Sequence, residues 1–278
     1  MDVLRTVAEV RAWRATHPDV ALVPTMGAFH EGHLSLMRQA QQLAPVVAVS
    51  LFVNPRQFGP GEDLTRYPRR EVQDLALAES VGVQLVYAPS VEEVYRSSVT
   101  TLEILGPALG FEGAYRPGHF NGVATIVLKL FNTIQPSHAI FGWKDLQQCA
   151  VIRRMVEDLD FPVKLAFLET IREADGLALS SRNVFLTPEE RILAPLFANT
   201  LRQVAAVNRQ TAAETWQDVH DHERQAVLRL RDHGFLPDYV TVVDSRTMLP
   251  AQAPHSANRV AGAVRIGSVR LIDNVPIE

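Results

Sequence analysis

Apolar residues in the first 168 positions follow two alternating periods. Short apolar runs predict buried strands at residues 20–23, 46–53, 84–88, 138–141 and 163–168. Between these runs, apolar residues recur at helical spacing and predict helices at residues 3–10, 36–43, 69–80, 122–134 and 145–158. Parallel strands need helical crossovers, so the alternation predicts an α/β fold with a Rossmann-like parallel sheet and helices on both faces.

The periodicity changes near residue 176. The sequence Thr-Pro-Glu-Glu at residues 187–190 is typical of a helix N-terminus, and a second long helix is expected near residues 211–233. Shorter runs predict strands at residues 239–243, 259–266 and 269–272, with a hairpin turn at residues 267–268. We therefore expect a Rossmann-like domain of residues 1–175 and a smaller C-terminal α+β domain of residues 176–278.

The composition is that of an ordinary globular protein, since 47% of the 278 residues are hydrophobic and the formal net charge is −4. A pI near 6.1 gives no broad attraction for nucleic acid or anionic lipid, so small molecules and other proteins are the expected partners. The one cysteine, Cys149, cannot form an internal disulfide, which is typical of a reducing compartment. With no apolar signal core and no run long enough to span a bilayer, we expect a cytoplasmic protein.

Two histidines follow the apolar run at residues 20–23, within the sequence PTMGAFHEGH. His30 and His33 are three positions apart at the expected start of a helix, where unpaired backbone amides favour an anion. Two imidazoles there can donate hydrogen bonds to phosphate oxygens, more strongly as those oxygens gain charge in a transition state. In the alternative, one histidine caps the helix and the other packs in the wall. Because both histidines occur beside glycines at a strand end, we favour the anion site.

Further polar side chains follow the later strands. Asn54 and Gln57 are neutral amides that can hold hydroxyls or a carboxylate without a charge that must be desolvated; a proline-containing turn is the alternative. Arg116 and His119 precede another predicted helix start. An anion contact and a role in ordering the loop are both compatible with that position.

Lys144 stands between a predicted strand and the helix that follows it. Lysine is rare among the 27 basic residues of the chain, which favours a selected role as a compact point charge on phosphate. A surface ion pair is the alternative. Gln148, one helical turn later, would face the same crevice. The sequence Ser-Ser-Arg at residues 180–182 lies at the expected hinge, residues 174–182, where a flexible loop could close over a polyphosphate.

The chain contains no phosphate-binding loop of the Walker type and no G-x-G-x-x-G after a strand, so a phosphate site must be of the histidine type. Five blocks between residues 24 and 183 resemble the pantoate-β-alanine ligase (pantothenate synthetase) family of the nucleotidyltransferase superfamily: PTMGAFHEGH, FVNPRQF, RPGHFNGV, FGWKDLQQ and DGLALSSRN. The H-x-G-H signature alone is shared with cytidylyltransferases, adenylyltransferases and class I aminoacyl-tRNA synthetases. Five blocks in register are specific to the one family, and the chain length fits its two-domain members.

The resemblance implies an ATP- and Mg²⁺-dependent reaction in two steps. The carboxylate of pantoate attacks the α-phosphorus of ATP, which gives pantoyl adenylate and diphosphate. The amine of β-alanine then attacks the acyl carbon and releases AMP and pantothenate, a precursor of coenzyme A. The resemblance also implies a cytoplasmic homodimer, in which residues 1–175 bind nucleotide and pantoate and residues 176–278 act as a lid.

The resemblance assigns roles to individual residues. His30, His33 and Lys144 would be catalytic, with His30 as the proton donor. Gln57, Gln148 and Asn54 would bind pantoate, and Gln57 would also bind β-alanine. ATP would be bound by Met26, Gly27, Ala28, Phe29, His30, Glu31, Gly32, His33, Gly142, Trp143, Lys144, Asp145, Ile171, Leu179, Ser180, Ser181 and Arg182.

Some features leave alternatives open. Trp143 stands where the family usually has glutamate, so we infer that this side chain is not chemically required, and Phe29 replaces the more frequent leucine. Glu62 and Asp63 are candidate metal ligands, and Mg²⁺ held mainly by ATP oxygens and water is equally compatible. Rival functions are nucleotidyl transfer to a phosphorylated acceptor and nucleotide binding without catalysis. An aminoacyl-tRNA synthetase is disfavoured, since an acidic chain leaves little basic surface for tRNA.

Overall fold

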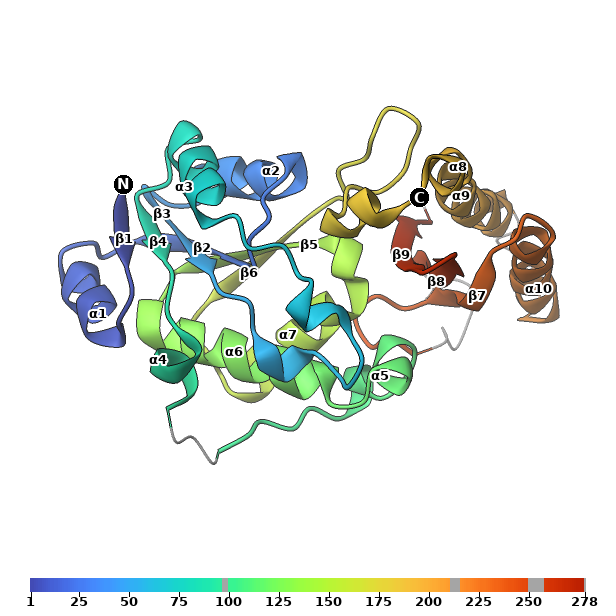
Figure 1. The fold of residues 1–278 in the computed structure, drawn as a ribbon. Helices are drawn as coiled ribbons and strands as arrows, with labels where there is room; N and C mark the ends of the chain where they lie inside the picture. Colours follow the sequence, from blue (N-terminus) through green and yellow to red (C-terminus); the bar gives the residue numbers. More distant parts are fainter. Residues whose placement is uncertain (97–99, 211–215, 250–257, 278) are drawn as a thin grey trace. The chain divides into compact units, whose positions relative to one another are not determined.

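The structure is a computed structural model that describes residues 1–96, 100–210, 216–249 and 258–277 (Figure 1). The chain forms two compact units. The first contains Met1–Gly142 and Val151–Leu168, and the second contains Trp143–Ala150 and Glu169–Glu278. The predicted division at residue 175, with its separate binding and lid functions, stays a prediction.

The first unit is built on a six-stranded sheet in the order β1-β4-β3-β2-β5-β6. Its strands are β1 (Asp2–Leu4), β2 (Val20–Thr25), β3 (Val46–Leu51), β4 (Leu85–Tyr87), β5 (His138–Gly142) and β6 (Lys164–Leu168). Every pairing in this sheet is parallel. The connection order reverses between β2 and β5, and ligands of open parallel sheets bind at such a switch point, beyond the carboxyl ends of the strands.

Helices cover both faces of this sheet. They are α1 (Val7–Ala15), α2 (Glu31–Ala40), α3 (Glu71–Ser80), α4 (Val91–Tyr95), α5 (Glu112–Tyr115), α6 (His119–Ile134) and α7 (Leu146–Asp158). Figure 1 shows α2 and α3 on one face and α6 on the other. A buried cluster that includes Leu34, Met37, Val47 and Val86 joins α2 to the sheet. The predicted Rossmann-like parallel sheet with helices on both faces is confirmed.

The N-terminal segment differs from the prediction. Val3 lies in β1 beside Val86, and α1 begins only at Val7. Thr6 caps this helix, because its side chain accepts from the Glu9 backbone N–H while the Glu9 carboxylate accepts from the Thr6 N–H. The helix predicted from Val3 is therefore wrong at its start, since helical spacing there joined a strand residue to a helix by coincidence.

Other predicted elements of the first unit are present with shifted ends. The helix predicted from residue 122 begins three positions earlier, at His119, and the helix predicted from residue 69 begins at Glu71. The sequence pattern does not predict α4 and α5, because helices of 5 and 4 residues are too short to display a helical period.

The second unit contains a three-stranded antiparallel sheet in the order β7-β8-β9. Its elements are α8 (Pro188–Leu193), α9 (Pro195–Gln210), α10 (Trp216–Asp232), β7 (Leu236–Val243), β8 (Arg259–Ile266) and β9 (Val269–Pro276). An apolar cluster that includes Phe197, Leu201, Leu230 and Val264 joins α9 and α10 to the sheet. The predicted smaller α+β part is confirmed, as is the predicted N-cap, where Thr187 accepts from the Glu190 N–H.

Two predictions for this unit need comment. The strand predicted at residues 269–272 is too short, because β9 continues through Asp273 and Asn274, which are buried although polar. The long helix predicted near residues 211–233 corresponds to α10, while residues 211–215 lie outside the described residues. Within the described residues, no helix is long and apolar enough to cross a membrane.

Candidate active site

A buried carboxylate holds the loop that follows β2. Asp74 of α3 accepts hydrogen bonds from the backbone N–H of Ala28 at 2.9 Å and of Phe29 at 2.8 Å. Gly27 has φ +88°, and a Cβ there would lie 2.7 Å from Leu51 Cδ1, so the position favours glycine. Burial raises the pKa of Asp74, although both backbone donors act in the opposite direction. These contacts fix the chain immediately before α2.

His30 and His33 form the N-terminus of α2. His30 is the N-cap residue: its Nδ1 accepts from the Gly32 N–H at 3.2 Å, and its own backbone N–H donates to His33 Nδ1 at 3.4 Å. The ring centroids are 4.2 Å apart. Because both Nδ1 atoms accept, the neutral form of each ring carries its proton on Nε2. Because capping uses only the Nδ1 atoms, the capping and anion-binding interpretations are compatible.

Asn54 is a buried residue that connects the 3₁₀ turn after β3 to α4 and α6 through its side-chain amide. Its Nδ2 donates to Gln57 Oε1 at 3.0 Å and to the Gly122 carbonyl at 3.1 Å. Its Oδ1 accepts from the Arg56 N–H at 3.2 Å and from the Tyr95 hydroxyl. Asn54 is 1% exposed, and these four bonds use both donors and both acceptor positions of the amide. The contacts support a positioning role for Asn54 rather than direct contact with a substrate.

Gln57, at the end of the 3₁₀ turn η1 (Pro55–Gln57), reaches the loop after β2. Its Nε2 donates to Met26 Sδ at 2.9 Å, while Asn54 fixes its Oε1. Gln57 follows β3 and Met26 follows β2, so the structure brings together two clusters that neighbouring parallel strands predict to meet. A thioether is a weak acceptor, and a substrate oxygen in its place would accept a stronger hydrogen bond.

Arg116 and His119 clamp the main chain of Gln57. His119 Nδ1 donates to the Gln57 carbonyl at 2.7 Å, and Arg116 donates to the same oxygen at 3.2 Å. Arg116 Nη1 lies 3.1 Å from His119 Nε2, and two further N–H groups of Arg116 bind both carboxylate oxygens of Glu62 at 2.8 and 2.7 Å. These contacts favour the loop-ordering interpretation of both residues over an anion contact.

The electrostatics of this clamp agree with its hydrogen bonds. Burial, followed by the charge of Arg116, lowers the pKa of His119 to about 4, so the imidazole is neutral at physiological pH. Burial acts to raise the pKa of Glu62, but hydrogen bonds and the charge of Arg116 outweigh burial and lower it. The carboxylate and guanidinium are therefore both charged and paired.

Close packing of α6 against η1 depends on Gly122. A Cβ at this position would lie 2.2 Å from the Arg56 carbonyl oxygen and 2.8 Å from the Gln57 backbone N. Both atoms belong to main chain and cannot move aside as a side chain could. Gly122 therefore lets α6 support the turn that carries Gln57.

The second unit carries Lys144 on the 3₁₀ turn η4 (Trp143–Asp145), directly before α7. Its Nζ lies 3.7 Å from Asp145 Oδ1, and its side chain is 20% exposed. This contact matches the ion pair considered as the alternative, but 3.7 Å is too long for a hydrogen bond. Gln148, one turn further along α7, is half-buried.

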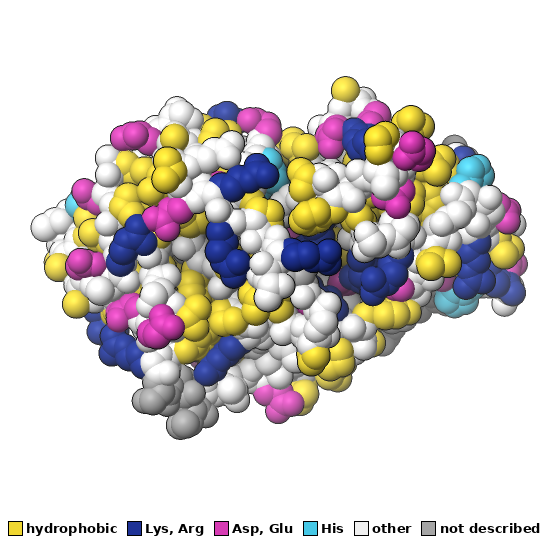
Figure 2. All heavy atoms as spheres, viewed as in Figure 1, with side chains coloured by type: hydrophobic (Ala, Val, Ile, Leu, Met, Phe, Trp, Pro, Cys, Tyr) yellow, Lys and Arg dark blue, Asp and Glu magenta, His cyan; other side chains and the backbone are white. Residues whose placement is uncertain are grey.

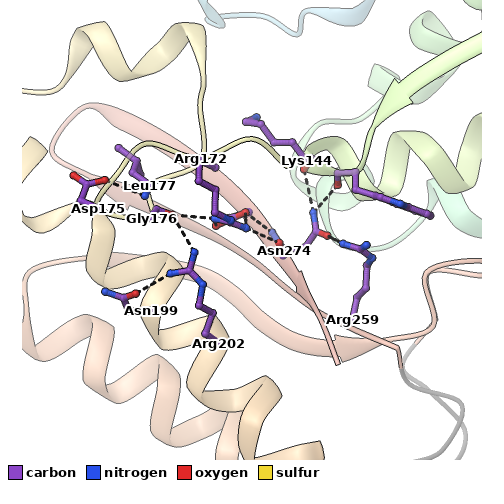
Figure 3. Close-up of polar contacts among 12 residues, drawn as sticks. Lys144, Arg172, Asp175, Gly176, Leu177, Asn199, Arg202, Arg259 and Asn274 are labelled. Atoms are coloured by element: carbon purple, nitrogen blue, oxygen red, sulfur yellow. Dashed lines mark hydrogen bonds and ion pairs between the residues drawn. The ribbon is translucent and has the colours of Figure 1, made fainter. Parts of the chain in front are cut away.

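The turn around Lys144 is held by residues of β8 and β9 (Figure 3). Asn274 Nδ2 donates to the Trp143 carbonyl at 2.6 Å and contacts the Lys144 carbonyl at 3.3 Å. Asn274 Oδ1 accepts from Arg259 Nη1 at 2.7 Å. The Arg259 guanidinium lies 4.5 Å from the centre of the Trp143 ring and also pairs with Glu169. Trp143 therefore packs on a cation of its own unit, which accounts for an aromatic residue at this position.

The segment from Ile171 to Arg182 forms a hydrogen-bonded hairpin. The Leu179 N–H donates to the Ile171 carbonyl at 3.0 Å, and Ser180 caps the 3₁₀ turn η5 (Ser181–Phe185) through the Arg182 N–H at 3.3 Å. Arg191 pairs with Glu173 and Asp175 on the same hairpin, and its hydrogen bond lowers the pKa of Asp175. The segment predicted to close over a polyphosphate is thus ordered by its own hydrogen bonds and ion pairs in this structure.

The described residues do not build a protein metal site. Among them, no group of three or more His, Cys, Asp or Glu side chains could hold a metal ion. Glu62, one of the two candidates, uses both carboxylate oxygens for Arg116. The side chain of Asp63, the other candidate, lies outside the described residues.

Sequence reasoning missed the residues that support these functional side chains. They are Asp74, Tyr95, Arg259, Asp273 and Asn274. One signal was present: Asp273 occupies the inward register of β9, in line with the buried Val269, Leu271 and Val275. A carboxylate in an otherwise apolar inward register indicates a buried ion pair.

Charge of both signs is mixed on the surface. On the face in Figure 2, Lys and Arg side chains are interspersed with acidic and hydrophobic ones.

Comparison with known proteins identifies the family. Residues 2–276 match the pantoate-β-alanine ligase family. The pantothenate synthetase of Chloroflexus aggregans is 49% identical over 278 residues, which cover 99% of each chain. The pantoate-β-alanine ligase of Thermus thermophilus has a TM-score of 0.91 at 44% identity, over 100% of this chain and 99% of that one. The ligase of Francisella tularensis, solved with beta-gamma ATP and β-alanine, has a TM-score of 0.83 at 31% identity, over 100% and 98%.

The fold and the histidine-capped helix define a nucleotide-dependent α/β enzyme. The chain belongs to the pantoate-β-alanine ligase family, whose members condense pantoate with β-alanine in an ATP-dependent reaction.

Proposed function

We propose that this chain makes pantothenate from (R)-pantoate, β-alanine and ATP through a pantoyl adenylate. The observation that carries the proposal is the pair of histidines at the start of α2, whose Nδ1 atoms both accept in the helix cap, supported by the family match over residues 2–276. In the first step a pantoate carboxylate oxygen bonds to the α-phosphorus and the bond to the diphosphate oxygen breaks. In the second step the β-alanine nitrogen bonds to the acyl carbon and AMP leaves with that oxygen.

His30, His33 and Lys144 would stabilise the charge that develops in the first step. The two imidazoles can donate through Nε2 to phosphate oxygens while Nδ1 remains in the helix cap. Lys144 would add a full positive charge to the oxygens of the leaving diphosphate. Donors aimed at developing charge stabilise the transition state more than the ground state. The family resemblance also assigns His30 as the proton donor in the reaction.

Gln57 and Gln148 would orient pantoate. The amide of Gln57 is fixed from behind by Asn54, so that its Nε2 faces the loop after β2, where the thioether of Met26 is a replaceable partner. Gln148 would hold the acid from α7. A carboxylate held in line with the scissile bond reacts as part of a single complex, and this orientation supplies much of the rate. Gln57 would contact β-alanine in the second step.

Backbone and side chains at four places would receive the nucleotide. They are the loop and helix start at Met26, Gly27, Ala28, Phe29, His30, Glu31, Gly32 and His33, the turn at Gly142, Trp143, Lys144 and Asp145, then Ile171, and the segment Leu179, Ser180, Ser181 and Arg182. The hydroxyls and guanidinium of the last segment suit phosphate oxygens. Residues 176–278 would act as a lid.

Mg²⁺ would enter with ATP. Because Glu62 uses both carboxylate oxygens for Arg116, phosphate oxygens and water would supply most of the ligands of the ion. When bound, the ion would neutralise charge on the phosphates.

A homodimer in the cytoplasm is the expected setting. Leu105 and Leu109 are each 63% exposed, and apolar side chains of this size at neighbouring exposed positions are compatible with a covered surface. The sequence has a single cysteine, which is buried and cannot form a disulfide within the chain, as suits a reducing compartment. Light scattering on the purified chain would give its mass in solution.

Exchange of labelled diphosphate into ATP tests the proposal. We expect exchange that requires pantoate and not β-alanine, because adenylate formation needs only the acid. Exchange that ignores pantoate, or that proceeds better with CTP, would contradict the ligase function. A nucleotidyltransferase would keep the nucleotide in its product, whereas this chain should release AMP, and a binding protein without catalysis would give no exchange.

A further inference from the structure

Asn274 of β9 joins two parts of the second unit that are 130 residues apart in sequence (Figure 3). It is 1% exposed, and its amide group contacts the carbonyls of two consecutive residues, Trp143 at 2.6 Å and Lys144 at 3.3 Å. These are two of the three residues of η4. A turn of three residues makes few hydrogen bonds of its own, so its geometry depends on such external partners.

The chemistry of this contact requires a primary amide. A primary amide has two N–H donors for the two neighbouring carbonyls and also an acceptor oxygen, whereas Lys and Arg side chains donate but cannot accept. That acceptor, Asn274 Oδ1, binds Arg259 Nη1 at 2.7 Å. Aspartate has nearly the same shape but would place an oxygen against two carbonyl oxygens. The site therefore distinguishes asparagine from aspartate by hydrogen-bond polarity alone.

Arg259 provides a second restraint on the same turn. Its guanidinium lies 4.5 Å from the centre of the Trp143 ring, so the side chain of that residue is packed while Asn274 holds its main chain. Arg259 is itself 6% exposed and is fixed by Asn274 and by Glu169. Trp143, the residue before Lys144, is thus fixed in two ways: Asn274 of β9 binds its main chain, and Arg259 of β8 packs on its side chain.

The neighbouring residue connects the same strand to the hairpin at residues 171–182. Asp273 binds Arg172 through both carboxylate oxygens at 2.7 and 2.9 Å. Arg172 also donates to the Asn274 carbonyl at 3.0 Å and to the Gly176 carbonyl at 3.1 Å. One dipeptide of β9 therefore orders both segments of this unit that the proposed function assigns to the phosphates of ATP.

We propose that Asn274 is a positioning residue for Lys144, which it fixes by holding the carbonyls of η4. This proposal rests on the proposed function, because it takes Lys144 as the cation that acts on the phosphates. A displacement of about 1 Å at a reacting group can lower a rate by about 100-fold, even when the substituted residue is remote from the chemistry. The same effect is expected here, with Asn274 making no contact with any substrate.

The test is a double-mutant cycle on the single-turnover rate of pantoyl adenylate formation. The variants are Asn274→Ala, Lys144→Ala and the double variant, with Asn274→Asp as the conservative replacement. Asn274→Ala and Asn274→Asp should each lower the rate by about 100-fold. In the Lys144→Ala background, Asn274→Ala should lower the rate by less than about tenfold, because the cation that it positions is already absent and only the other nucleotide contacts of η4 are disturbed.

Val269→Ala is the matched control. Val269 lies on the same strand and is buried, but it contacts neither η4 nor Arg172 in the hydrogen bonds above. It should melt at a lower temperature and still form the adenylate within about threefold of the wild-type rate. If Asn274→Ala does not fold, Asn274→Asp, which preserves volume, carries the cycle.

Each outcome separates the two proposals. Wild-type protein that makes no adenylate would overturn the proposed function itself. An active wild type with a full rate in folded Asn274→Ala, or with an equally large loss in the Lys144→Ala background, would overturn the positioning role and leave the function intact.

Discussion

The two units support their functional side chains in different ways. In the first unit, His30 and His33 are themselves part of the structure that holds them, since their Nδ1 atoms complete the cap of α2. In the second unit, Lys144 contributes only its backbone carbonyl to the support, and Asn274 supplies the donors from a strand 130 residues later. One support is local in sequence and the other is distant.

The difference predicts how each site fails. A substitution of His30 or His33 should disturb the helix cap and the proposed chemistry together, because the same imidazole ring serves both. In the second unit the two functions are on separate residues, so support and chemistry can be removed one at a time.

The largest effect is expected on the stability of the second unit. Asp273 has a side-chain exposure of 2% and accepts from two nitrogens of Arg172, so Asp273→Ala removes a buried carboxylate and both of these hydrogen bonds. Removing one partner of a buried pair costs about 3 to 5 kcal/mol. Hydrogen exchange should show the loss in the amides of β8 and β9 and little change in β2 and β3.

Asp238→Ala is the control for that experiment. Asp238 pairs with Arg270 in the same sheet, but its side chain is 15% exposed against 2% for Asp273, and the cost should be smaller because this pair is partly hydrated. Equal losses of protection in the two variants would show that the Asp273 pair is no more than a surface contact.

The second prediction concerns Lys144. Lys144→Ala should lower the single-turnover rate of adenylate formation by roughly 100- to 1000-fold, or about 2.7 to 4 kcal/mol, with almost no change in melting temperature. Lys144→Arg should recover only part of the rate, because a planar guanidinium approaches phosphate differently. A loss below about tenfold in folded Lys144→Ala would return this residue to the ion pair with Asp145, since such pairs contribute about 0 to 1 kcal/mol.

The third prediction concerns the His119 clamp in the first unit. The pKa of His119 falls from 6.5 to about 4 on folding, so between these pH values the unfolded chain binds a proton that the folded chain does not. Stability contributed by the neutral ring is present above about pH 6.5 and decreases as the pH falls toward 4. From pH 7 to pH 5 the loss should be about 2 kcal/mol.

Urea unfolding of the wild type and of His119→Gln at pH 7, 6 and 5 measures this contribution. Glutamine keeps a donor for the Gln57 carbonyl without a titrating ring. The pH dependence of the variant should be weaker by about 2 kcal/mol over this interval. Identical slopes would mean that His119 is protonated in the folded state or that its neutrality has no consequence.

The smallest effect is expected for the residues that orient pantoate. Gln57→Ala and Gln148→Ala should raise the KM for pantoate and lower kcat, together by about tenfold, because each removes one or two neutral hydrogen bonds of about 0.5 to 1.5 kcal/mol. The Kd for ATP should change little. A defect confined to ATP affinity would assign these glutamines to the nucleotide instead.

The contrast between the units also explains what the sequence could predict. Parallel strands and the helix start at His30 follow from local periodicity and from the position of residues after a strand, so the α/β fold and the first cluster could be anticipated. The helix predicted from Val3 failed because Val3, a strand residue, falls at helical spacing from Val7 and Val10 by chance, and the Thr6 cap sets the boundary.

Residues that hold a functional segment far away in the sequence leave little signal in the sequence itself. Asp273 and Asn274 read as the polar end of a strand, whereas both are buried and β9 continues to Pro276. Their role depends on contacts with Arg172, Arg259 and η4, none of which is a neighbour in sequence. Likewise, only the structure distinguishes Asn54, with its four internal hydrogen bonds, from Gln57, whose amide faces the loop after β2.

The central claim is that the carboxylate of pantoate attacks the α-phosphorus of ATP. Pantoate labelled with ¹⁸O in its carboxylate, incubated with ATP, β-alanine and the protein, tests it directly by mass spectrometry of the products. We predict that AMP carries one ¹⁸O atom and that diphosphate carries none. Label in phosphate with release of ADP, or unlabelled AMP, would contradict the account.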